Sequence, residues 1–285
     1  MLRWRLALGV LFVALLVGLF WADWYAAREY EFVRGRLIQP LAFVVLFLAT
    51  SEFCGLVRRR VPELSRFVLT VGNAIVLAAA FEPSLPFQSA AFVCAVLGLL
   101  LNEMLRYDKD RSQQVTERLG VGVFGLVYVG VFLGYLVRLW MLPVGPVALT
   151  SMLAVVKLGD IGAYTVGRLF GRHKLCPKLS PGKTIEGLAG AVLFSCLGAL
   201  VIGHLWGPPL AAGHGPARWL AYGALLSLVG ALGDLAESML KRDFGAKDSS
   251  TWMPGFGGVL DLVDSPLVAA PIAWMLWESG WLGGP

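Results

Sequence analysis

Charged residues are scarce in this chain: only 15% of its 285 residues are Asp, Glu, Lys or Arg, against roughly a quarter in soluble domains. Histidine occurs three times and cysteine four times, without any CxxC pair, which argues against a zinc site or a disulfide framework. No nucleic-acid-binding motif is present, so the net charge of +5 needs another explanation. The chain is rich instead in hydrophobic residues, which make up 57% of it and give a mean hydropathy of +0.71.

Apolar stretches of about 20 residues, the length of a membrane-spanning helix, recur from one end of the chain to the other. We therefore predict an all-α, polytopic integral membrane protein with about nine transmembrane helices. The spans are expected at roughly 6–25, 37–57, 67–82, 86–105, 119–140, 147–167, 187–206, 218–240 and 259–279. No small-residue cleavage site follows the first apolar run, so we interpret it as a retained helix and not as a signal peptide.

Lysine and arginine gather in alternate connections between these spans. One side of the membrane would carry Arg3, Arg5, Arg58, Arg59, Arg60, Arg66, Arg106, Lys109, Arg111, Arg118, Arg168, Arg172, Lys174, Lys178, Lys183, Lys241, Arg242 and Lys247. The other side would carry only Arg28, Arg34, Arg36, Arg138 and Arg218. Because positive loops stay in the cytoplasm, the bias predicts a cytoplasmic N-terminus and an external C-terminus. It also explains the net positive charge.

The chain shows no internal repeat and no soluble domain between its spans. We divide it into N-terminal transmembrane helices, 1–145, and a C-terminal transmembrane catalytic region, 146–285. The second part carries two long cytoplasmic loops, 168–186 and 241–258, which hold most of the candidate functional residues.

Two predicted helices near the C-terminus each present a pair of carboxylates on one face. Asp234 and Glu237 are three residues apart, as are Asp261 and Asp264, so each pair projects to one side of its helix. Ionisable groups at membrane depth are costly and usually functional. If the two faces meet, their oxygens suit Mg²⁺ better than zinc. The alternative is that these acids form buried salt bridges with Lys241, Arg242 or Lys157.

The loop between the two helices is basic and rich in glycine, and it ends in the sequence PGFGG over residues 254–258. Glycines let backbone N–H groups approach a phosphate, and the N-terminus of the following helix favours an anion. An ordinary basic loop with a hinge is the alternative.

A second polar segment, SPGKT over residues 180–184, indicates a turn that leads into a helix. It offers hydroxyls, a lysine and free backbone donors, but it is not a Walker A loop because the required first glycine is missing. A helix cap in a basic loop is an equally good interpretation. Just upstream, Lys157 and Asp160 lie one helical turn apart and are expected to form an ion pair.

The segment S-M-L-K-R-D-F-G-A-K-D, from Ser238 to Asp248, followed by P-G-F-G-G-V-L-D-L-V-D, from Pro254 to Asp264, resembles the signature of phosphatidate cytidylyltransferases, the CDP-diacylglycerol synthases of the CdsA type. The runs 160–171 and 180–187 are similar to the same family, as are the short segments 51–53 and 127–129. Two positions depart from it: Phe256 and Leu262 stand where the family has His and Arg.

The resemblance implies condensation of CTP with phosphatidic acid to give CDP-diacylglycerol and pyrophosphate, with Mg²⁺ as cofactor and a second cation left open. It implies metal binding by Asp234, Glu237, Asp261 and Asp264, and catalysis by Asp234, Lys241, Arg242, Asp261 and Asp264. The substrates would contact Asp160, Tyr164, Ser180, Lys183, Thr184, Ser238, Lys247, Asp248, Gly257 and Gly258. Membrane lipids are the expected partners, nucleic acids are not, and a homodimer is compatible with the sequence.

The expected location is the cytoplasmic (inner) membrane, with the active site facing the cytoplasm. Two other functions stay open. An ion-coupled transporter would use membrane carboxylates as ion sites, often within inverted repeats, but these acids lie beside cytoplasmic loops. A cytidylyltransferase or kinase acting on another lipid phosphate fits the same residues.

Overall fold

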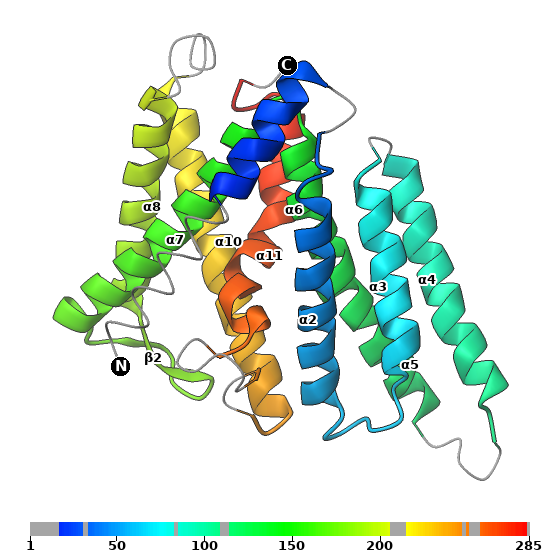
Figure 1. The fold of residues 1–285 in the computed structure, drawn as a ribbon. Coiled ribbons are helices and arrows are strands. Elements are labelled where there is room, and N and C mark those ends of the chain that lie inside the picture. The colour runs from blue at the N-terminus through cyan, green and yellow to red at the C-terminus, as the bar shows by residue number, and fades with distance from the viewer. Residues whose placement is uncertain are drawn as a thin grey trace.

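The computed structural model describes residues 17–30, 34–82, 85–108, 114–205, 215–246, 249–250 and 257–283. Nearly all of their regular structure is helical (Figure 1). After a helical stretch at 17–29, the helices are α2 (Gln39–Val57), α3 (Arg66–Ala80), α4 (Leu85–Leu105), α5 (Val115–Gly125), the π-helix η2 (Leu126–Val131), α6 (Phe132–Met141), α7 (Gly145–Phe170), α8 (Ile185–Leu205), α10 (Pro216–Asp243) and α11 (Val259–Glu278).

Seven helices of the described chain are long and apolar enough to cross a membrane, with α5, η2 and α6 forming one continuous helix over Val115–Met141. A further apolar helix, α3, is shorter. These eight helices coincide, within a few residues, with the second to ninth predicted spans. The first span is helical over 17–29, and its beginning lies outside the described residues. The prediction of an all-α polytopic membrane protein is therefore confirmed.

The last helix, α11, lies between two packed groups of helices (Figure 1). Its first half contributes Val259, Leu260 and Leu267 to a core with residues of α2, α3, α4 and η2. Its second half contributes Ala269, Ala270, Ala273 and Trp277 to a core with residues of α7, α8 and α10. Both packed groups therefore depend on this helix.

Small residues let α7, α8 and α10 approach one another closely. A Cβ atom at Gly162 of α7 would lie 2.8 Å from Cβ of Phe194 on α8. A Cβ at Gly223 of α10 would lie 2.7 Å from Cα of Cys196. Such close backbone contact is how membrane helices gain packing energy without a hydrophobic driving force.

The loop after α7 contains a small antiparallel sheet that the sequence analysis did not predict. Strand β1 (Lys174–Cys176) pairs with β2 (Ser180–Thr184), with Lys174 opposite Thr184. The predicted turn at 180–184 is therefore wrong, because this segment pairs its backbone with β1. The helix cap, which the sequence left as an equally good interpretation, is present: helix α8 follows directly, and Thr184 Oγ1 accepts a hydrogen bond from Gly187 N at 3.0 Å.

The connections from α2 to α3 and from α7 to α8 lie at the same end of the helical bundle as the end of α10 (Figure 1). In the connection from α2 to α3, Arg60 forms an ion pair of 2.9 Å with Asp243 at the end of α10, and Arg59 donates to the carbonyl of Gly245 at 2.8 Å. The α10 end is thus held beside the α2–α3 connection.

Candidate active site

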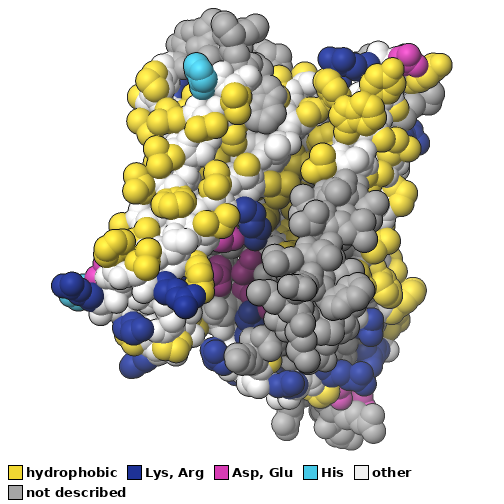
Figure 2. Space-filling model, turned by 60° about the vertical axis from the view of Figure 1, so that its left-hand side comes forward, with side chains coloured by type: hydrophobic (Ala, Val, Ile, Leu, Met, Phe, Trp, Pro, Cys, Tyr) yellow, Lys and Arg dark blue, Asp and Glu magenta, His cyan; other side chains and the backbone are white. Residues whose placement is uncertain are grey.

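The acidic turns of α10 and α11 face each other where the two helices approach closely. A Cβ atom at Gly233 of α10 would lie 2.9 Å from the carbonyl oxygen of Asp264 on α11. This approach brings Asp234 and Glu237 against the first turns of α11. Figure 2 shows acidic side chains, with basic side chains beside them, in a hollow of a face that is otherwise mostly hydrophobic or uncharged.

Lys241 joins the acidic faces of the two helices. Its Nζ lies 2.7 Å from Glu237 Oε2 and 2.7 Å from Asp261 Oδ1. All three side chains are largely buried, with 14%, 3% and 13% of their surfaces exposed in that order. In this arrangement the two acids form the buried salt bridges that the sequence analysis named as the alternative to metal binding.

Asp261 also caps the N-terminus of its own helix, α11. Its Oδ2 accepts hydrogen bonds from Gly258 N at 2.7 Å, Ser249 Oγ at 2.8 Å and Ser249 N at 3.1 Å. Gly257 has a φ of +79°, and a Cβ there would overlap Asp261 Oδ2. The glycines therefore bring backbone close to an anion, as the sequence predicted, but this anion is a carboxylate of the chain itself.

A buried carboxylate from α2 also accepts hydrogen bonds from the first amides of α11. Glu52 Oε1 accepts from Val259 N at 2.9 Å, and Oε2 accepts from Leu260 N at 2.9 Å and from Ser249 Oγ at 3.2 Å. In the sequence, Glu52 falls in one of the short family-like segments, 51–53, and has no predicted role. A carboxylate within an apolar span was the signal that could have found it.

The hairpin supplies a lysine to the other acid of α10. Lys183 Nζ on β2 lies 2.8 Å from Asp234 Oδ2, with 23% and 41% of the two side chains exposed. This contact joins the segment 180–184 to the acidic helix pair, which the sequence analysis treated as separate. Asp264 is buried, and its Oδ1 accepts from the following amide, Ser265 N, at 2.6 Å.

Lys157 connects α7 to the same region. Its Nζ lies 3.1 Å from Asp160 Oδ2, which confirms the predicted ion pair. The same Nζ donates to the carbonyl of Leu262 on α11 at 3.4 Å. That carbonyl has no helical N–H partner, because Pro266 four residues later lacks an N–H group. Lys157 thus takes the place of the missing backbone donor.

The remaining candidates lie around this centre or outside the described residues. Tyr164 is exposed on α7, where its hydroxyl accepts a hydrogen bond from Arg168 Nη1 at 2.7 Å. Ser238 is partly buried and Arg242 is exposed, both on the last turns of α10. Lys247, Asp248 and Phe256 are not among the described residues.

The π-helix η2 carries a buried tyrosine that was not singled out from the sequence. Tyr128 is 3% exposed, and its hydroxyl has no hydrogen-bond partner within the described chain. It lies on a π-helical turn, a feature often found near functional sites.

The fit of this donor set to a metal ion is mixed. Four carboxylates suit a hard cation such as Mg²⁺, and Glu237 Oε1 is buried without a hydrogen-bond partner. Within the described residues, however, no three His, Cys, Asp or Glu side chains are arranged to hold a metal. A cation would compete with Lys183 for Asp234 and with Lys241 for Asp261 and Glu237.

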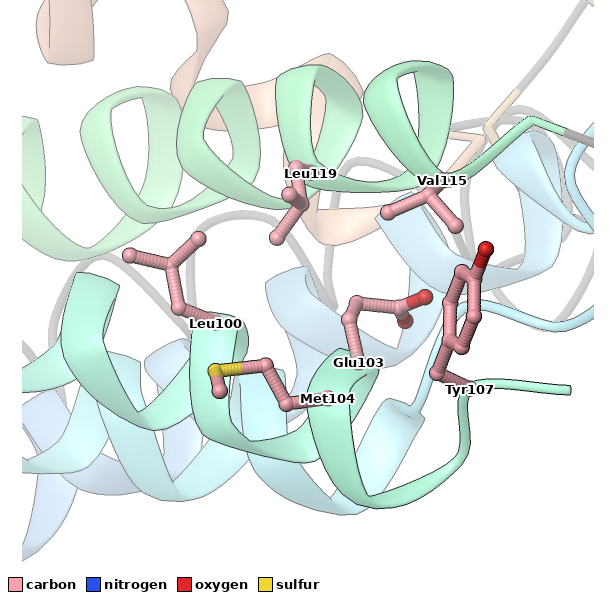
Figure 3. Close-up of a pocket in the computed structure, with 6 residues that line it drawn as sticks. All are labelled: Leu100, Glu103, Met104, Tyr107, Val115 and Leu119. Atoms are coloured by element: carbon pink, nitrogen blue, oxygen red, sulfur yellow. The ribbon is translucent and has the colours of Figure 1, made fainter. Parts of the chain in front are cut away.

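A cavity of about 370 Å³ lies elsewhere, between α4 and α5 (Figure 3). It is lined by Leu100, Glu103, Met104, Tyr107, Val115 and Leu119, none of them a candidate site residue. Glu103 binds Arg118 at 2.8 Å, so the charge in its wall is already paired. We therefore place the candidate site in the hollow at α10 and α11, not in this cavity.

A family model and several known proteins are similar to this chain. A model of the cytidylyltransferase family matches residues 5–279 of the chain. The phosphatidate cytidylyltransferase of Pseudomonas aeruginosa is 34% identical over 282 residues, covering 98% of this chain and 91% of that protein. The uncharacterized protein YnbB of Escherichia coli (strain K12) is 32% identical over 247 residues, covering 84% and 79%. The phosphatidate cytidylyltransferase of Mycobacterium leprae is 28% identical over 257 residues, covering 85% and 80%.

Proposed function

The chain belongs to the cytidylyltransferase family, and we propose that it is a phosphatidate cytidylyltransferase, which makes CDP-diacylglycerol and pyrophosphate from CTP and phosphatidic acid. Relatives that carry this name match most of its length. The observation that carries the proposal is the meeting of Lys183, Lys241 and the acids of α10 and α11 at one end of an integral membrane protein.

The reaction transfers a cytidylyl group between two phosphates. An oxygen of the phosphatidate phosphate attacks the α-phosphorus of CTP and forms a new P–O bond. The bond from the α-phosphorus to the oxygen that bridges it to the β-phosphorus breaks, and pyrophosphate leaves. The chemistry needs alignment and neutralisation of negative charge more than it needs a protein nucleophile.

The basic side chains would hold the phosphates. Lys183 and Lys241 already contact the acidic centre, which consists of Asp234, Glu237, Asp261 and Asp264. Arg242 is exposed on α10, in the turn that follows Lys241. Charge-assisted hydrogen bonds to phosphate are among the stronger ones in proteins. The further substrate contacts proposed from the sequence are Asp160, Tyr164, Ser180, Thr184, Ser238, Lys247, Asp248, Gly257 and Gly258.

We also propose Mg²⁺ as cofactor, held by Asp234, Glu237, Asp261 and Asp264, with a second cation left open. Bound there, the ion would neutralise charge on the phosphates of CTP. Binding requires the two lysines to release carboxylate oxygens, and the incoming phosphates offer those lysines new partners. The lysines would thus exchange carboxylate for phosphate when nucleotide and metal arrive together.

The proposed setting is the cytoplasmic (inner) membrane, with nine spans, a cytoplasmic N-terminus and the site on the cytoplasmic side. The distribution of lysine and arginine supports this orientation. Phosphatidic acid would enter laterally from the bilayer, and Figure 2 shows the acidic hollow on a side face of the bundle. A homodimer is compatible with this arrangement and is not required by it.

The test uses the full chain purified in detergent, with labelled CTP, Mg²⁺ and phosphatidic acid. Formation of labelled CDP-diacylglycerol by the wild type, and its loss in Asp234→Ala, would support the function. If phosphatidic acid gives no product while an isoprenoid phosphate does, the chain acts on another lipid phosphate. If no lipid phosphate gives a cytidylylated product, the proposed function is wrong.

A further inference from the structure

Glu52 lies in an unusual position for a buried acid, because it caps a helix far from it in sequence. It is 7% exposed on α2, five residues before the end of that apolar helix. Its two oxygens accept from Val259 N and Leu260 N, each at 2.9 Å, at the start of α11. A carboxylate at this depth is costly unless it is bonded, and here the start of α11 bonds both of its oxygens.

The start of α11 needs an acceptor from outside the helix. The first N–H groups of a helix have no partner within it, and a side chain at the N-cap position normally satisfies one of them. That position is Gly258, which has no side chain. A Cβ there would overlap Glu52 Oε2 and Ser249 Oγ, so a glycine at this position makes room for the carboxylate.

Ser249 links Glu52 to the acidic centre. Its hydroxyl lies 3.2 Å from Glu52 Oε2 and 2.8 Å from Asp261 Oδ2. A hydroxyl has one hydrogen to donate, so the two carboxylates share it. From Asp261 the contacts continue through Lys241 to Glu237 on α10, at 2.7 Å for each step. A continuous chain of polar contacts thus runs from α2 through α11 to α10.

We propose that Glu52 is a positioning residue for the transfer reaction. By holding the first turn of α11 and Ser249, it fixes the place of Asp261 and, through Asp261, of Lys241. The carboxylate would act without contacting either substrate, because both of its oxygens already accept hydrogen bonds from the protein. This inference rests on the proposed function for its effect on catalysis, while its effect on the α11 N-terminus can be measured without any substrate.

The test variant is Glu52→Gln, which keeps the shape of the side chain and replaces one acceptor oxygen by an NH₂ donor. That donor would face either the Val259 amide or the Leu260 amide together with the Ser249 hydroxyl. We expect kcat to fall on the order of 10–100-fold, the scale of misplacing a group in an active site. KM for CTP should change by less than about threefold, because no contact to nucleotide is removed.

Asp23→Asn is the matched control. Asp23 is fully buried and accepts from Gly35 N at 2.9 Å, Leu37 N at 2.9 Å and Trp140 Nε1 at 2.8 Å. It therefore has the same kind of bonding as Glu52, with partners outside the acidic centre. We expect it to lower the thermal midpoint as Glu52→Gln does, with kcat of the folded protein close to wild type.

Amide hydrogen exchange provides a readout that needs no activity. In Glu52→Gln the amides of Val259 and Leu260 should exchange faster, while those of the middle of α11 keep their protection. A second variant, Ser249→Ala, should also lower kcat. In the double variant with Glu52→Gln, the loss of kcat should be smaller than the two single losses combined, since both residues act through Asp261.

The outcomes separate the two proposals. If the amides of Val259 and Leu260 exchange at the wild-type rate in Glu52→Gln, Glu52 does not cap α11. Unchanged kcat, a raised KM at unchanged kcat, or a kcat loss equal to that of Asp23→Asn would overturn the positioning role. A wild type that cytidylylates no lipid phosphate would overturn the proposed function and the catalytic part of this inference, while exchange would still decide the cap.

Discussion

Lys183 of the β-hairpin and Asp234 of α10 form an ion pair, with 2.8 Å between Nζ and Oδ2. The carboxylate is 41% exposed, and ion pairs in contact with solvent stabilise a fold by less than about 1 kcal/mol. Because Lys183 Nζ is buried, the pair opens at little cost only when another anion, such as a phosphate, takes the place of the carboxylate. A contact that adds little stability yet brings a predicted phosphate ligand to a predicted metal ligand is better explained by function.

Replacing Lys183 by Met should raise KM for CTP and lower kcat/KM by about 10–100-fold, the scale of a hydrogen bond to a charged group. Thermal unfolding should change little. Steady-state kinetics in detergent measure the first effect and a melting curve the second. Lys178→Met, an exposed lysine of the same hairpin, is the control, and an equal loss there would show that only the charge of the hairpin matters.

Removal of divalent cations by a chelator should abolish product formation, and added Mg²⁺ should restore it. Asp234→Asn should lose about 100-fold or more in kcat at saturating Mg²⁺, because Asp234 is both a proposed ligand of the ion and the partner of Lys183. Asp243→Asn alters an exposed acid of the same helix end that binds Arg60, and it should keep near wild-type activity. Full activity in the chelator would contradict the metal proposal.

Gly258→Ala should destabilise the protein by about 1–3 kcal/mol, the usual cost of forcing an extra methyl group into a packed site. The new Cβ would overlap Glu52 Oε2 and Ser249 Oγ. Gly55→Ala, on the same helix as Glu52 and with open space around its Cα, should have no such effect. Thermal midpoints of the two variants check this, and equal midpoints would refute the crowding at Gly258.

The double variant Phe256→His with Leu262→Arg restores the two residues usual in the family. We expect it to raise kcat/KM for CTP, because an imidazole and a guanidinium both donate hydrogen bonds to phosphate. The measurement is the ratio of kcat/KM to wild type, with each single variant alongside. A ratio of one or less would mean that these positions do not limit the rate.

The apolar spans could be predicted from the sequence because their lengths and their flanking charges are set by the bilayer. The span expected at 218–240, for example, corresponds to α10 over Pro216–Asp243. Each pair of acids on α10 and α11 could be placed on one face of its helix in the same way, since helical spacing fixes which side chains share a face.

What could not be predicted depends on contacts between distant segments. The hairpin needs the pairing of Lys174–Cys176 with Ser180–Thr184, and strands this short leave almost no periodic signal. The contact of Glu52 with Val259 joins residues 207 positions apart. Its sequence signals, an acid in an apolar span and a glycine at a helix start, do not say that the two meet.

The polar contacts of Glu52 and of Arg60 cross the boundary that the sequence suggested near residue 145, and α11 packs into the cores on both sides of it. Each hydrophobic core contains residues from both halves of the chain. Loosening the N-terminal helices would uncap α11, and loosening α11 would open both groups of helices. We therefore expect the two halves to unfold together in a single step, and a C-terminal fragment alone would lack the carboxylate that caps its helix α11.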